Sequence, residues 1–153
     1  GGRLLPGRIY SAVYILEENC FLMQSDGAYR AEYSGQISGA SPSEIFLSGV
    51  SGARLCLAPD SALAYSGIAV AQRGSGNAAG VWRLYGAARR ADGDIALAGE
   101  PSVSFICGDA AASAYGVTVS ANTDAQVLSV FACGDALESV RWRVCLDCVE
   151  IRL

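Results

Sequence analysis

Residues 140–153 read Val-Arg-Trp-Arg-Val-Cys-Leu-Asp-Cys-Val-Glu-Ile-Arg-Leu, and this stretch decides the fold class. Up to residue 147, apolar side chains alternate with other ones, which is the period of a β-strand that buries one face. The face expected to be buried carries Val140, Trp142, Val144 and Leu146. The opposite face carries Arg141, Arg143, Cys145 and Asp147.

The alternation changes phase near the end of this stretch. After Cys148 the apolar positions move to Val149, Ile151 and Leu153. A strand exchanges its two faces only through an inserted residue or a bend, because the side-chain period is two. The pattern therefore predicts a β-bulge near Cys148.

Similar alternating segments recur upstream, separated by turn residues. Residues 63–73, 81–89 and 126–133 alternate in the same way, and Asp-Gly pairs at 26–27 and 92–93 are strong hairpin signals. Roughly ten short strands at this spacing predict an all-β fold, an antiparallel, jelly-roll-like β-sandwich. We expect a single domain over residues 1–153, with residues 1–42 less regular.

Composition excludes several classes of protein. The 153 residues are 52% hydrophobic and 17% charged, which is unlike a disordered chain. There is no His and no Lys, so Ser-His-Asp catalysis and Schiff-base chemistry are impossible within this chain. A net charge of −4 argues against a nucleic-acid partner. No apolar run is long enough for a membrane span. We therefore expect neither membrane insertion nor enzymatic activity.

Six cysteines leave the redox state open, and we favour buried reduced thiols because a chain of this size does not need disulfides. Cys145-x-x-Cys148 has the spacing of a metal or redox motif. In a strand, however, residues three apart point to opposite faces, so these thiols should not converge. We expect no metal and no cofactor.

Carboxylates and aromatic residues are the remaining candidates for a site. Asp92 and Asp94 lie where Asp side chains usually form turns, which we favour over a two-carboxylate glycosidase site. Trp82 and Trp142 are in phase with apolar neighbours and should lie in the core. The aromatic residues expected to contact a ligand at the surface are Tyr10, Tyr29 and Tyr33.

From Ser43 onward, an ordered series of segments resembles a known family, the C-terminal β-domain of bacteriophage and prophage tail-fibre-like structural proteins. The matching segments include Ser43-Glu-Ile-Phe-Leu-Ser-Gly49, Leu55-Cys-Leu-Ala-Pro-Asp-Ser-Ala-Leu-Ala-Tyr65, Val81-Trp-Arg-Leu-Tyr-Gly86, Val119-Ser-Ala-Asn-Thr123 and residues 140–151. Upstream, residues 7–17 are similar to the family's first strand, and residues 21–40 look like an insertion. The family supplies no catalytic residues for transfer to this chain.

The resemblance implies a structural protein of the virion: a homotrimeric fibre, spike or appendage domain that contacts other virion proteins. It also implies an extracellular location on the virion and a contribution to host-surface attachment, with a host glycan as the expected ligand. Two alternatives remain open, a monomeric carbohydrate-binding module and a capsid-decorating protein. A two-carboxylate glycosidase is the enzymatic alternative.

Overall fold

The computed structural model describes residues 12–15, 20–23 and 27–152. These ranges form twelve strands and one 3-10 helix, η1 (Ala110–Ala114). Eight strands have seven residues or fewer: β1 (Ala12–Ile15), β2 (Cys20–Met23), β4 (Ser43–Leu47), β5 (Arg54–Cys56), β8 (Asp94–Leu97), β9 (Ser102–Gly108), β10 (Gly116–Asn122) and β11 (Val127–Cys133). Four are longer: β3 (Gly27–Ser38), β6 (Ser61–Arg73), β7 (Ala79–Ala91) and β12 (Ser139–Arg152). The all-β class is confirmed.

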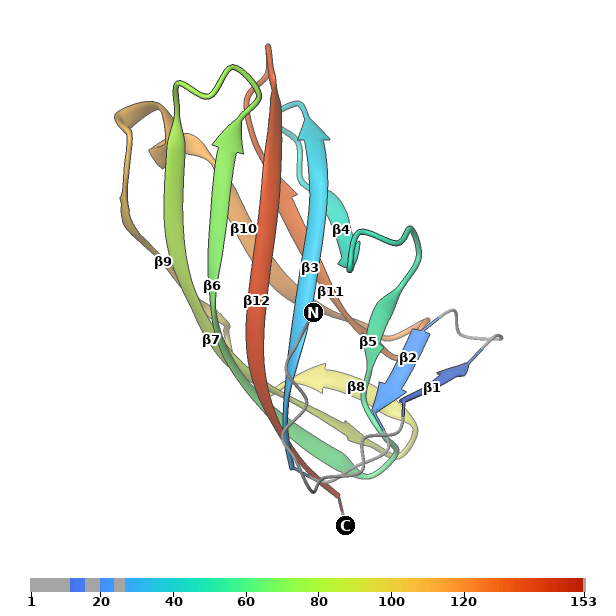
Figure 1. The fold of residues 1–153 in the computed structure, drawn as a ribbon. Coiled ribbons are helices and arrows are strands. Elements are labelled where there is room, and N and C mark those ends of the chain that lie inside the picture. The colour runs from blue at the N-terminus through green and yellow to red at the C-terminus, as the bar shows by residue number, and fades with distance from the viewer. Residues whose placement is uncertain (1–11, 16–19, 24–26, 153) are drawn as a thin grey trace, which may run out of the picture.

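The four long strands form one layer, in the order β3-β12-β6-β7 (Figure 1). β12 pairs antiparallel with β3 on one side and with β6 on the other. β10 and β11 cross behind this layer, and β5 pairs antiparallel with the start of β11. Every strand pair is antiparallel except β2 with β5. None of the helices in the described ranges is long and apolar enough to cross a membrane.

The core lies between the two layers. From the long layer come Tyr33, Leu84, Val144 and Leu146, all buried. Val119, Leu128 and Val130 face them from β10 and β11. Each such aliphatic side chain contributes about 1.5–3 kcal/mol when it leaves water, so the alternation of the long strands is the main source of stability.

The bulge predicted near Cys148 is wrong. The register of β12 runs without a break from Ser139 to Glu150 against β3, and as far as Arg152 against β6. Cys148 and Glu150 therefore point inward, while Val149 and Ile151 are exposed. The buried Glu150 carboxylate accepts hydrogen bonds from the Tyr29 hydroxyl (3.4 Å) and the Ala58 N–H (3.2 Å). Because the buried carboxylate is hydrogen-bonded, Glu150 can occupy an inward position, and the strand keeps its alternation without a bulge.

The region expected to be less regular contains one of the longest strands. β3, twelve residues long, lies within residues 1–42, the part of the chain expected to be less regular. Its pairing with β12 along its whole length overrides the weak local preference for strand. Whether residues 21–40 are an insertion stays a prediction.

The two lateral sides of the sandwich differ. On one side, β4 pairs with both β11 and β3 and so joins the two layers through hydrogen bonds. On the other side the layers end at β9 and β10. β9 pairs with β7, and β10 pairs with β11, and no described strand pairs with the second edge of either. We call these the closed side and the open side.

The cysteines only partly match the expectation of reduced, buried thiols. Cys107, Cys133, Cys145 and Cys148 are free, and of these Cys148 is buried while Cys107 is exposed. Cys56 is disulfide-bonded, so the expectation of six reduced thiols is wrong.

Candidate binding surfaces

A shallow groove of about 710 Å³ crosses the outer face of the long layer. Its walls come from β3, β12 and β6, because residues paired across these strands share one face. Five polar side chains line it: Ser34, Gln36, Gln72, Arg141 and Arg143. Ile68, Val70 and Cys145 add an apolar part.

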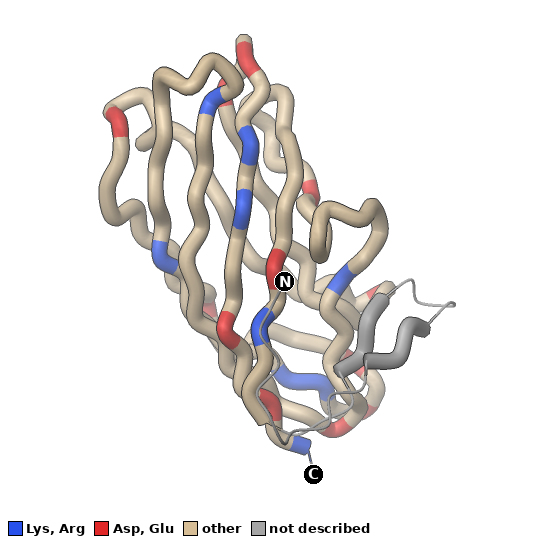
Figure 2. Tube along the Cα trace, in the orientation of Figure 1, with Lys and Arg blue, Asp and Glu red and all other residues tan. Residues whose placement is uncertain are grey.

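The charges along this face are arranged unevenly. At the lower end, Arg30 Nε lies 2.7 Å from Asp147 Oδ1 in an exposed ion pair. At the upper end, Arg141 and Arg143 are exposed and form no ion pair with any described residue. Figure 2 shows blue segments in the upper half of β12, where these two arginines lie. The groove is therefore a cationic site with donors available for an anion.

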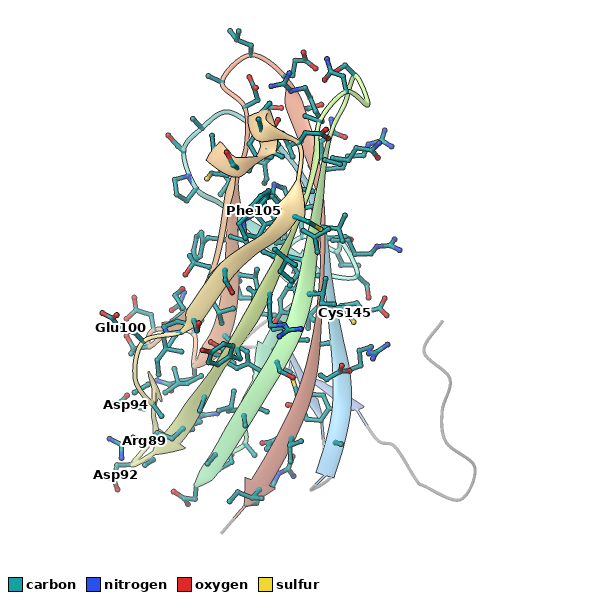
Figure 3. The ribbon with its side chains drawn as sticks, turned by 90° about the vertical axis from the view of Figure 1, so that its left-hand side faces the viewer. Arg89, Asp92, Asp94, Glu100, Phe105 and Cys145 are labelled. Carbon is teal, nitrogen blue, oxygen red and sulfur yellow. The ribbon has the colours of Figure 1, made fainter. Side chains whose placement is uncertain are left out.

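Cys145 is half-buried in the groove and points away from the core (Figure 3). Burial raises the pKa of this thiol, and the nearby Arg30 charge, which acts in the opposite direction, offsets only part of the increase. Cys148 points into the core, where burial raises its pKa to about 12. The expectation that the two thiols face opposite ways is confirmed. Among the described residues, no group of three or more His, Cys, Asp and Glu could hold a metal ion.

A second hollow, of about 480 Å³, lies beside the groove between β6 and β7. It is lined by Ser66, Ile68, Arg83, Tyr85 and Asp147, among others. The Tyr85 side chain is exposed. An exposed aromatic ring beside hydroxyl and charged groups suits a sugar ring better than it suits a purely apolar ligand.

The predicted tyrosines do not form a common surface. Tyr10 lies outside the described residues. Tyr29 is partly buried, and its hydroxyl donates to Glu150. Tyr33 is only 1% exposed, so its expected place at the surface is wrong: the unbroken pairing of β3 turns it into the core. Burial raises the pKa of both Tyr29 and Tyr33. Ligand binding by Tyr10 and Tyr29 stays a prediction.

The tryptophans lie where their phase predicted. Trp82 and Trp142 are buried, with ring centroids 4.9 Å apart. Phe105 of β9 packs edge-on against Trp82, with centroids 5.2 Å apart, and is itself 39% exposed. The sandwich core therefore reaches the surface at Phe105, on the open side (Figure 3).

The acidic residues weighed as a catalytic pair act as turn residues. Asp92 and Gly93 have φ of 55° and 88° and form the tight connection between β7 and β8. The Asp94 carboxylate accepts a hydrogen bond from Gln126 Nε2 at 3.3 Å. Figure 3 shows both residues at the lower end of the sandwich, away from the groove.

Sequence reasoning missed the groove. Its residues come from three strands that are distant along the chain and adjacent only in the sheet. One signal was available: Ile68 and Val70 are apolar in the β6 sequence, yet they share a phase with polar Ser66 and Gln72. Apolar residues on the polar face of a strand mark a surface that is not fully solvated.

No family model matches the chain, and no curated protein matches it. Among solved structures, it is similar to the tailspike protein gp49 from Acinetobacter baumannii bacteriophage Fri1, a capsular polysaccharide depolymerase. The identity is 12% and the TM-score 0.37, over 93% of this chain. The chain spans only 21% of that protein, and a likeness this low carries no argument about function.

Proposed function

We propose that this chain is a non-catalytic structural domain of a phage tail fibre, spike or similar appendage, that it assembles as a homotrimer, and that it contributes to host-surface attachment. Two features support the proposal: the ordered sequence resemblance to tail-fibre-like proteins, and the open side of the sandwich. The disulfide at Cys56 is typical of proteins that function outside the reducing cytosol, in keeping with a virion location.

The observation that carries the proposal is the edge strand β9. Natural proteins protect exposed strand edges with charges, proline or a covering segment, because a bare edge pairs with other chains. The seven residues of β9 include no charged residue and no proline. Phe105 is 39% exposed and Ile106 48%. An edge of this kind is suited to pairing with another strand.

The second strand can come from another copy of the chain. β10 lies on the same side, pairs only with β11 among the described strands, and is also uncharged. If β9 of one copy pairs with β10 of the next, the contact is heterologous, and such contacts form a ring when the rotation between copies closes. A ring of three would pair the free edges of β9 and β10 and cover Phe105.

The test is the mass of the purified chain by light scattering after size exclusion. We expect three times 15.8 kDa, about 47 kDa. Ile106→Lys places a charge on the β9 edge and should shift the mass to that of a single chain. Leu137→Lys is the matched control, because Leu137 is 93% exposed on the β11–β12 loop, and this variant should remain trimeric.

A wild-type mass of 15.8 kDa would contradict the trimer and favour the monomeric carbohydrate-binding module, whose aromatic contact would be Tyr85. A trimer that Ile106→Lys leaves intact would keep the assembly and remove β9 from the interface. Release of products from a host polysaccharide would contradict the non-catalytic role. A capsid-decorating protein would give the same masses, and immunogold labelling of virions separates the two locations.

A further inference from the structure

We propose that the groove across β3, β12 and β6 binds a polysaccharide that carries carboxylate groups, with Arg141 and Arg143 as its carboxylate-binding residues. This inference rests on the proposed attachment role, and it names the class of ligand and the site.

The first argument is charge. The whole chain has a net charge of −4, but the outer face of the long layer has the opposite sign. Residues that share this face in the strand registers include five arginines and two acids: Arg30, Arg83, Arg89, Arg141, Arg143, Glu32 and Asp147. A cationic face on an acidic protein concentrates anionic ligands there.

The second argument is that the groove arginines have no partner within the described chain. Arg30 is held by Asp147, and Arg54 and Arg73 are held by acids elsewhere, whereas Arg141 and Arg143 are not. A guanidinium binds a carboxylate through two parallel N–H···O bonds. Arg141 and Arg143 are two residues apart on one strand, so their Cα atoms lie about 7 Å apart. This spacing suits successive charges of a polymer better than one small anion.

The third argument is the rest of the lining. Gln36, Gln72 and Ser34 supply both donors and acceptors, which match sugar hydroxyl groups. Ile68 and Val70 supply an apolar surface for the face of a sugar ring. The groove lies over central strands whose backbone groups are already paired, so an added peptide strand has no edge to bind there.

A nucleic acid fits this groove less well. Its backbone carries one charge per phosphate, and the net charge of the chain would repel it beyond the groove. A polysaccharide with carboxylates is less densely charged and offers the hydroxyl groups that the amide side chains require.

The experiment measures binding of fluorescently labelled polygalacturonate and hyaluronate to the full chain, with neutral dextran as the uncharged polymer. The double variant R141Q/R143Q should lose about tenfold or more in affinity, because two charge-assisted contacts are removed. The control is R89Q, which removes an exposed arginine of the same face that lines neither the groove nor the second hollow. It should change affinity less than about threefold, through long-range charge alone.

Four results would overturn the inference: neither acidic polymer binds, dextran binds equally well, R89Q weakens binding as much as R141Q/R143Q does, or dextran sulfate and duplex DNA bind as tightly as polygalacturonate. The three arginines are exposed and form no ion pair with a described residue, so both variants should keep the wild-type melting temperature, which is measured alongside. Light scattering on the same samples separates the two proposals. A trimer that does not bind the polymers overturns only the groove, and a monomer that binds them overturns only the assembly.

Discussion

The closed and open sides of the sandwich differ in how the edges of the two layers are covered. Both are places where two layers end and the core would meet water. On the closed side, β4 hydrogen-bonds to both layers, and its own residue Ile45 is 1% exposed. On the open side no described strand pairing joins β9 to β10; η1 connects them and buries Ala112, and Phe105, packed against Trp82, stays 39% exposed. This contrast supports the proposal that the open side is completed by another copy of the chain.

The side chains at the closed side reinforce the bridge. Arg54 donates to both carboxylate oxygens of Glu44, at 2.7 and 2.6 Å, and its guanidinium lies 5.3 Å from the Phe46 ring centroid. Burial alone would raise the pKa of Glu44, but the hydrogen bonds and charge of Arg54 hold it below the usual value. No comparable ion pair joins β9 to β10 in the described part of the chain.

The largest difference in unfolding free energy between the two sides is expected when one apolar side chain is truncated on each side. Ile45→Ala should cost about 3 kcal/mol of unfolding free energy, because it leaves a cavity where the layers are fixed together. Phe105→Ala should cost about 1 kcal/mol in the isolated chain, since its ring is already partly in water. Urea unfolding of both variants at a concentration that keeps the chain monomeric measures the difference. Equal losses would mean that the open side is as well packed as the closed side.

A smaller effect should come from the ion pair on the closed side. Arg54→Gln should cost about 1 kcal/mol near neutral pH. The sign with pH follows from the Glu44 pKa, which is lowered in the folded state. The stabilisation is present above the unfolded-state pKa of Glu, about 4.3, and is lost as pH falls through the lower folded-state pKa. The difference in stability between wild type and variant should therefore begin to shrink near pH 4 and disappear below the folded-state pKa. A constant gap down to pH 2 would contradict the role of this pair.

The smallest change in stability is expected from removing a single buried hydroxyl group, and it gives a reference for the two larger effects. The Tyr65 hydroxyl is buried with no hydrogen-bond partner among the described residues, and burial raises its pKa to about 12. Tyr65→Phe should therefore be neutral or stabilise the fold by up to about 1 kcal/mol, because it removes a desolvated polar group. Thermal unfolding measures it. A loss above about 1 kcal/mol would show that the hydroxyl has a partner, such as a buried water.

Several features of the fold could be predicted from the sequence because they depend on neighbours along the chain. The alternation over residues 140–146 correctly predicted which side chains of β12 are buried. The phase of Trp82 and Trp142 placed both in the core, and Asp92-Gly93 was correctly assigned to a turn. The candidate site could not be predicted in this way, since its residues belong to three strands whose pairing is not local.

The all-β class, the alternation of faces and the turn positions are local properties of the sequence, since each follows from a period of two or from one dipeptide. The tertiary structure decided the rest. Pairing with both neighbours kept β12 in register through Cys148, turned Glu150 inward and left Val149 and Ile151 exposed. The same pairing buried Tyr33, brought Arg141 and Arg143 beside Gln36 and Gln72, and left β9 at an edge. The physical reason is that strand neighbours are chosen by the summed packing and hydrogen bonding of whole strands, which no local pattern contains.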